Sequence, residues 1–213
     1  MNPENLELSL LSLFAVTSFF LMLLNEKIFS NNTINFFLDK DFNKPQAFHV
    51  DPISRTGGLA SIILFILYYI LDKNFINFLT YKYLLLGIGI FCIGFMDDLK
   101  INISPAVRLF LMVLLLISFI YYFSISIDRV DLKFLNMWLK SEIFLIFFIL
   151  ICFLFIINGA NLIDGFNGLL AMHLIIINFF LLLINLNNNH FEFSLFLISQ
   201  IIILSTFLLF NFP

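Results

Sequence analysis

The stretch at residues 143–163, IFLIFFILICFLFIINGANLI, carries no charged side chain. A helix that crosses a bilayer needs about 20 predominantly apolar residues, so this stretch is long enough to span. Six more charge-free runs occur at residues 8–25, 56–71, 83–96, 109–127, 165–189 and 193–213. The second and third runs are short and must borrow flanking residues to span. We therefore predict an all-α, polytopic transmembrane helix bundle of about seven spanning helices, forming a single integral-membrane domain over residues 1–213.

The composition supports a membrane protein. Of the 213 residues, 62% are hydrophobic and 12% are charged, whereas a soluble domain carries about 25% charged residues. The net charge is −3 and there is no basic patch, which makes nucleic acid an unsuitable partner and the lipid bilayer the expected one. Cys92 and Cys152 lie inside apolar runs, so we interpret both as small buried hydrophobes and not as a disulfide or metal site.

Charge asymmetry around the first run predicts the orientation. No Lys or Arg precedes that run, and several follow it. The basic residues that follow are Lys27, Lys40, Lys44 and Arg55. The positive-inside rule then places the N-terminus outside. Seven spans put residues 26–56, 96–105 and 158–168 on the cytoplasmic side, and residues 126–134 outside as a short hairpin or an interfacial segment.

The first cytoplasmic segment contains HVDPISRTGG at residues 49–58. Gly57 and Gly58 allow a ligand or another helix to approach the backbone closely. Arg55, next to the glycines, suits phosphate oxygens. The alternative is an ordinary membrane-flanking loop that ends at a glycine-rich helix start.

The second segment is IGFMDDLKINISP at residues 93–105. Asp97 and Asp98 are adjacent between two apolar runs, and ionisable residues at such positions often have a functional role. Ser104 can cap the next helix and Pro105 fits its first turn. The alternative is a solvated turn that merely ends a helix.

The third segment is NGANLIDGFNGLLA at residues 158–171. Asn158, Asn161, Asp164 and Asn167 recur at every third residue, and would line one side of a helical or near-helical turn. The glycines among them leave the backbone open to a ligand. The alternative is a polar turn that interrupts a long apolar run.

Together the three segments gather carboxylates, amides, glycines and basic residues on one membrane face. Mg²⁺ prefers oxygen ligands and is often held by one or two carboxylates and the phosphates of a substrate. Asp97 and Asp98 therefore suit metal-assisted phosphate chemistry at the membrane surface.

These segments, in this order and between spans, resemble the polyprenyl-phosphate N-acetylhexosamine-1-phosphate transferases of glycosyltransferase family 4. The family includes phospho-N-acetylmuramoyl-pentapeptide transferase, and this chain is more similar to the O-antigen-initiating type. The resemblance covers about residues 40–210. It implies a Mg²⁺-dependent enzyme, with Mn²⁺ as an alternative ion, in the bacterial cytoplasmic membrane. A UDP-N-acetylhexosamine and undecaprenyl phosphate would give a polyprenyl-diphospho-sugar and UMP on the cytoplasmic side, which would initiate lipopolysaccharide O-antigen or a similar envelope polysaccharide.

The resemblance also implies residue roles. Asp97 and Asp98 match the catalytic aspartate pair, and Asp98 and Asp164 match positions near the metal. The residues implied in substrate binding are His49, Arg55, Gly57, Gly58, Asn161, Gly165 and Asn167. Asn167 stands where the peptidoglycan enzyme has an aspartate next to uracil, which leaves the nucleotide preference open.

The chain departs from the family pattern at its end. Family members continue past the position of Pro213 with a Gly-Asp motif, whose aspartate is a metal ligand, and a His-rich loop. We therefore expect this chain to be the N-terminal part of a longer fold and to be poorly active or inactive by itself. The alternatives are an inactive truncated homologue, a partner subunit or an ion-coupled transporter. The transporter would place its polar residues at midspan, whereas here they sit at span ends. A homodimer is also left open.

Overall fold

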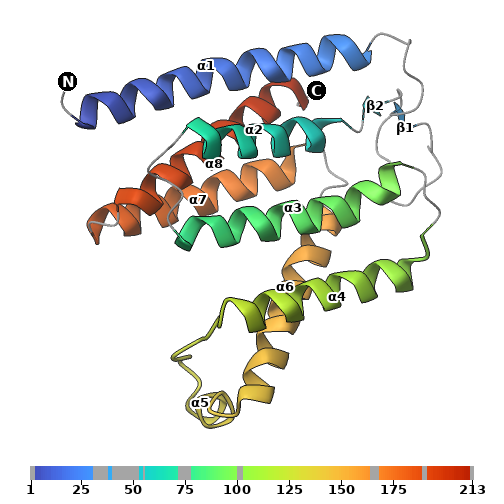
Figure 1. Cartoon of the computed structure of the whole chain (residues 1–213), viewed down its shortest axis with the longest axis vertical. Helices are drawn as coiled ribbons and strands as arrows, with labels where there is room; N and C mark the ends of the chain where they lie inside the picture. Colours follow the sequence, from blue (N-terminus) through green and yellow to red (C-terminus); the bar gives the residue numbers. More distant parts are fainter. Residues whose placement is uncertain are drawn as a thin grey trace. The chain divides into compact units, whose positions relative to one another are not determined.

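The computed structural model describes residues 3–30, 38–39, 53–54, 56–71, 78–99, 103–163, 168–188 and 191–211. The helices are α1 (Pro3–Ser30), α2 (Gly57–Leu71), α3 (Phe78–Asp98), α4 (Pro105–Tyr122), α5 (Lys133–Trp138), α6 (Glu142–Ile163), α7 (Leu169–Asn187) and α8 (Phe191–Asn211) (Figure 1). Two short strands, β1 (Leu38–Asp39) and β2 (Ile53–Ser54), pair antiparallel, with Leu38 opposite Ser54. The predicted all-α fold is confirmed.

Each of the seven charge-free runs contains a helix in the described part of the chain. Among the described residues, five helices are long and apolar enough to cross a membrane, namely α1, α4, α6, α7 and α8. The apolar helical stretches Gly57–Leu71 in α2 and Tyr81–Met96 in α3 are shorter. These correspond to the two runs that the sequence marks as short. The structure thus supports a multi-pass membrane protein, and the count of seven spans stays a prediction.

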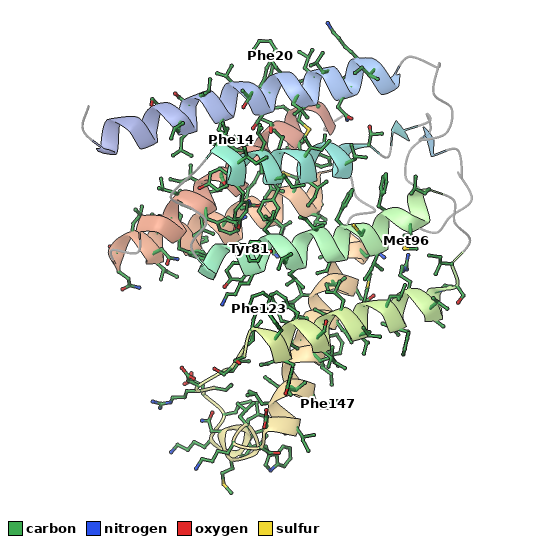
Figure 2. The ribbon with its side chains drawn as sticks, viewed as in Figure 1. Phe14, Phe20, Tyr81, Met96, Phe123 and Phe147 are labelled. Carbon is green, nitrogen blue, oxygen red and sulfur yellow. The ribbon has the colours of Figure 1, made fainter. Side chains whose placement is uncertain are left out.

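The chain divides into two compact units, Met1–Leu85 with Ile163–Pro213, and Leu86–Leu162. In the first unit, α1, α2 and α8 pack together around buried apolar side chains. The Phe14 ring of α1 lies edge-on to Tyr68 of α2, with 5.4 Å between the ring centroids. Phe14 points from α1 towards α2, whereas Phe20 lies on the opposite side of α1 and is exposed (Figure 2). The prediction of one domain is not tested by this division.

In the second unit, α3 and α4 approach closely at Gly89. A Cβ placed on Gly89 would lie 2.5 Å from Cδ1 of Leu115. No side chain larger than hydrogen fits there unless Leu115 moves, so Gly89 permits this close contact between the two helices. After the short connection that follows the aspartate pair, α4 thus meets α3 at this position.

Helix α4 ends in a Schellman motif. The Ile125 amide donates to the Ile120 carbonyl at 3.1 Å, and the Ser124 amide donates to the Tyr121 carbonyl at 3.3 Å. Ser124 has φ 48°, the left-handed conformation that such a motif needs and that favours glycine. The chain is therefore turned sharply at the end of α4 by local hydrogen bonds.

Two sequence-based interpretations change with the structure. Cys92 and Cys152 form no disulfide, but Cys92 is exposed and Cys152 only half-buried. The prediction that both are buried is wrong, because in a membrane protein an apolar side chain can face the surrounding lipid instead of the core. Residues 126–134 form no strand in the described part of the chain, which argues against a hairpin, and the segment leads directly into α5.

Candidate functional site

The aspartate pair lies in the last turn of α3. The helix continues to Asp98, and the Leu99 amide still donates to the Phe95 carbonyl at 3.0 Å. Helix α4 begins at Pro105, so the pair stands at the junction of two helices, as the sequence predicts. The side chains of Asp97 and Asp98 lie outside the described residues. A carboxylate at a helix C-terminus is near the negative end of the helix dipole, where a cation or water must compensate it.

The start of α4 has the opposite electrostatic character. The Ser104 hydroxyl accepts a hydrogen bond from the Val107 amide at 3.4 Å and Pro105 is in the first turn, which confirms the predicted cap. No acidic residue lies in this first turn, and half-buried Arg108 follows. Arg108 was not among the predicted binding residues. Its signal in the sequence is a basic side chain four residues after a helix N-cap.

The third segment begins inside α6. Asn158 and Asn161 are exposed in the last two turns of this helix, three residues apart, which confirms that these two share one side of a helix. The Asn158 amide nitrogen donates to the Leu154 carbonyl at 2.8 Å. A Cβ placed on Gly159 would meet no atom within 4 Å, so the backbone there is open.

The end of the third segment is only partly described. Asp164, Gly165 and Asn167 lie outside the described residues. Gly168 is buried, has φ 72° and caps the N-terminus of α7. Its left-handed conformation accounts for the glycine without any ligand.

The glycine pair of the first segment opens α2. A Cβ on Gly57 would lie 2.6 Å from Cε2 of Phe207 in α8, so at this glycine the close neighbour is another helix. Gly58 is exposed. His49 and Arg55 lie outside the described residues, so the structure does not relate these side chains to the glycines.

Candidate metal ligands were examined in the same way. The described residues contain no group of three or more His, Cys, Asp or Glu side chains able to hold a metal ion. The predicted ligands, Asp98 and Asp164, have side chains outside the described part of the chain, although their carboxylate oxygens are of the type that Mg²⁺ prefers. Asp97, Asp98, Asn161 and Asp164 would have to approach one another to share a phosphate and a metal, and this stays a prediction.

Comparison with known protein families matches residues 80–213 to glycosyl transferase family 4. The matched residues include the second and third segments but not the first, so His49, Arg55, Gly57 and Gly58 fall outside them. Comparisons with curated proteins and with solved structures find no match. Because the matched region covers more than half of the chain and both polar helix junctions, the chain belongs to glycosyl transferase family 4.

Proposed function

We propose that this protein transfers N-acetylhexosamine-1-phosphate from a UDP-sugar to undecaprenyl phosphate, in a bacterial cytoplasmic membrane and on its cytoplasmic side. The product, a polyprenyl-diphospho-sugar, would begin an envelope polysaccharide such as O-antigen. The observation that carries the proposal is the family match over residues 80–213, which includes both the aspartate junction and the asparagine-rich junction.

The position of these junctions suits a lipid acceptor. The phosphate of a polyprenyl phosphate lies at the membrane surface, while its chain stays in the hydrocarbon. Asp97 and Asp98 end α3, and α4 starts again at Pro105, so the connection between the helices is too short to carry the carboxylates far from that surface. In the proposed reaction Asp97 accepts the proton of the lipid phosphate.

The bonding change is a displacement at phosphorus. An oxygen of the lipid phosphate attacks the β-phosphorus of the UDP-sugar, the bond between that phosphorus and the bridging oxygen breaks, and UMP leaves. Arg108 and the amide end of α4 would hold phosphate oxygens, since both favour negative charge. Asn161 and Asn167 would bind the nucleotide through their amides. Mg²⁺ or Mn²⁺, held by Asp98 and Asp164, would neutralise charge on the diphosphate.

The test is release of UMP by the purified chain in lipid nanodiscs. UDP-GlcNAc and UDP-GalNAc are supplied separately with undecaprenyl phosphate and MgCl₂. We expect UMP release that requires the lipid, at a low rate for this chain alone. We expect Asp98→Asn to lower that rate about 100-fold or more, as losing one electrostatic group in an active site does.

The matched control is Asp128→Asn. This aspartate is exposed on the connection between α4 and α5, away from both polar junctions, so its loss should leave the rate unchanged. Absence of lipid-dependent UMP release with either donor would contradict the proposal. A rate for Asp98→Asn equal to that of Asp128→Asn would contradict the role of the aspartate pair.

A further inference from the structure

Helix α5 exposes an apolar face that the rest of the described chain covers only in part. Phe134, Met137 and Trp138 are 56%, 72% and 57% exposed. They are spaced three and four residues apart, which places them on one side of the helix. The Trp138 ring lies edge-on to Phe144 of α6, with 5.5 Å between centroids, so this face begins next to the start of α6 (Figure 1).

The other side of α5 is held in place. Leu135 is half-buried and Leu139, just after the helix, is only 8% exposed. The Asn136 side chain forms two hydrogen bonds with the backbone of Val130: its oxygen accepts from the amide at 2.8 Å, and its nitrogen donates to the carbonyl at 2.7 Å. The exposed aromatic face therefore has a fixed orientation relative to the preceding loop.

Charged side chains border this face. Lys133 and Lys140 are exposed at the start of α5 and just after its end. On a helix they fall on the same side as Asn136, next to Met137, so apolar and basic surfaces adjoin. The remaining charges of the connection are Asp128, Arg129, Asp131 and Glu142, so basic and acidic residues balance and no net charge selects an anionic partner.

The connection cannot extend far from a membrane. Helices α4 and α6 are both long and apolar enough to span one. Residues 139–141 alone separate α5 from α6, so the two helices are joined by at most about 14 Å of chain. An apolar face held this close to the end of a spanning helix lies within reach of the boundary between headgroups and acyl chains, where it can be buried away from water.

We propose that α5 is an interfacial anchor. It lies in the headgroup–acyl boundary with Phe134, Met137 and Trp138 inserted towards the acyl chains and with the lysine side chains extended towards lipid phosphates and water. Aromatic residues, tryptophan above all, prefer this boundary, and lysine stems reach outward from it. The surface is independent of the proposed transfer reaction, since it rests on the connection between α4 and α6 alone.

The anchor has a consequence for the third segment. From Glu142 to Asn161, α6 rises about 28 Å, close to the roughly 30 Å thickness of the hydrocarbon core. Fixing the start of α6 at one interface therefore places Asn161 at the other. In this arrangement α5 sets the depth of an asparagine of the candidate site without touching it.

The experiment uses the fact that Trp138 is the single tryptophan of the chain. The protein is reconstituted in phosphatidylcholine vesicles whose lipids carry bromine either near the headgroup or near the chain end. We expect stronger quenching of tryptophan fluorescence by the shallow bromine than by the deep one, because an interfacial helix lies about 5–10 Å deep. We also expect little quenching by aqueous iodide.

Three results would overturn the proposal. Strong iodide quenching without bromine quenching would place the face in water. Stronger quenching by the deep bromine would place it in the hydrocarbon. Quenching by neither would mean that protein covers the face, and a dependence on the protein-to-lipid ratio would then identify a second copy.

A pair of variants tests the face itself. Phe134→Ser combined with Met137→Ser should weaken shallow-bromine quenching of Trp138 and increase iodide quenching. Phe155→Ser is the matched control, because Phe155 is also exposed but lies in α6 outside the α5 face. Equal effects of the double variant and the control would count against the anchor.

Discussion

Replacing Gly57 by alanine separates the two interpretations of the glycine pair that opens α2. The new Cβ would lie 2.6 Å from Cε2 of Phe207, whereas ordinary contacts begin near 3.4 Å. The ring must move by almost 1 Å, and overpacking of this kind costs about 1–3 kcal/mol. Alanine in a helix offsets about 0.5–1 kcal/mol of that cost. We therefore expect Gly57→Ala to lower the free energy of unfolding by about 1 kcal/mol.

The assay is thermal unfolding in detergent micelles. A loss of 1 kcal/mol corresponds to a fall of about 2–4 °C in Tm for a chain of this length. Phe207→Leu removes the outer part of the ring, so the double variant Gly57→Ala with Phe207→Leu should be no less stable than Phe207→Leu alone. Gly58→Ala, at the exposed neighbouring glycine, should not lower Tm and serves as the control.

Two outcomes would refute this reasoning. If Gly57→Ala lowers Tm equally in the Phe207→Leu background, the ring is not the cause. If Gly57→Ala leaves Tm unchanged but abolishes UMP release, and Phe207→Leu does not restore it, Gly57 contacts substrate and the packing argument is wrong.

Three further changes test local features. Ser124→Gly removes the cost of a left-handed backbone at a non-glycine residue and should raise the free energy of unfolding by about 0.5–1 kcal/mol in thermal unfolding. Ser126→Gly, at a residue without positive φ, should not stabilise the protein. Equal effects of the two variants would show that the φ of Ser124 is not the cause. Asn136→Ala removes both hydrogen bonds to the Val130 backbone and should speed hydrogen exchange of the Val130 amide about tenfold or more. An unchanged exchange rate would count against these hydrogen bonds. Arg108→Lys should raise KM for the UDP-sugar about tenfold in the UMP assay, because a point charge replaces a bidentate donor, and an unaltered KM would remove Arg108 from the donor site.

Elements set by local chemistry could be predicted from the sequence. Charge-free length predicted every long helix, and the Ser104–Pro105 pair predicted where α4 begins, since a cap depends on a few neighbouring residues. The start of α1 could not be predicted in this way: the apolar run begins at residue 8, but the helix begins at Pro3. Glutamates near a helix N-terminus favour its dipole, so polarity there does not end the helix.

Features that depend on distant residues could not be predicted. Gly57 and Phe207 are far apart in the sequence, so the sequence alone leaves open whether a ligand or another helix approaches this glycine. The six-residue α5 begins at the end of a polar–apolar alternation, residues 126–134, that also suits a strand. The hydrogen bonds between the Asn136 side chain and the backbone of Val130 are contacts that no local propensity reveals. Glycine at position 168 could serve either a left-handed backbone or close approach of a ligand, and only its φ angle of 72° shows that the backbone conformation accounts for it.

The ends of the helices add a physical argument for phosphate chemistry. Asp97 and Asp98 stand in the last turn of α3, and this turn contains no basic residue. Carboxylates at the negative end of a helix are unfavourable by about 0.3–1 kcal/mol each, and selection for stability alone would place lysine or arginine there. Helix α4, which follows this pair, has no acidic residue in its first turn, which leaves its positive end suited to an anion. The α3–α4 junction thus combines carboxylates that a cation would stabilise with a helix end that favours an anion, and the proposed metal-bound diphosphate would supply both.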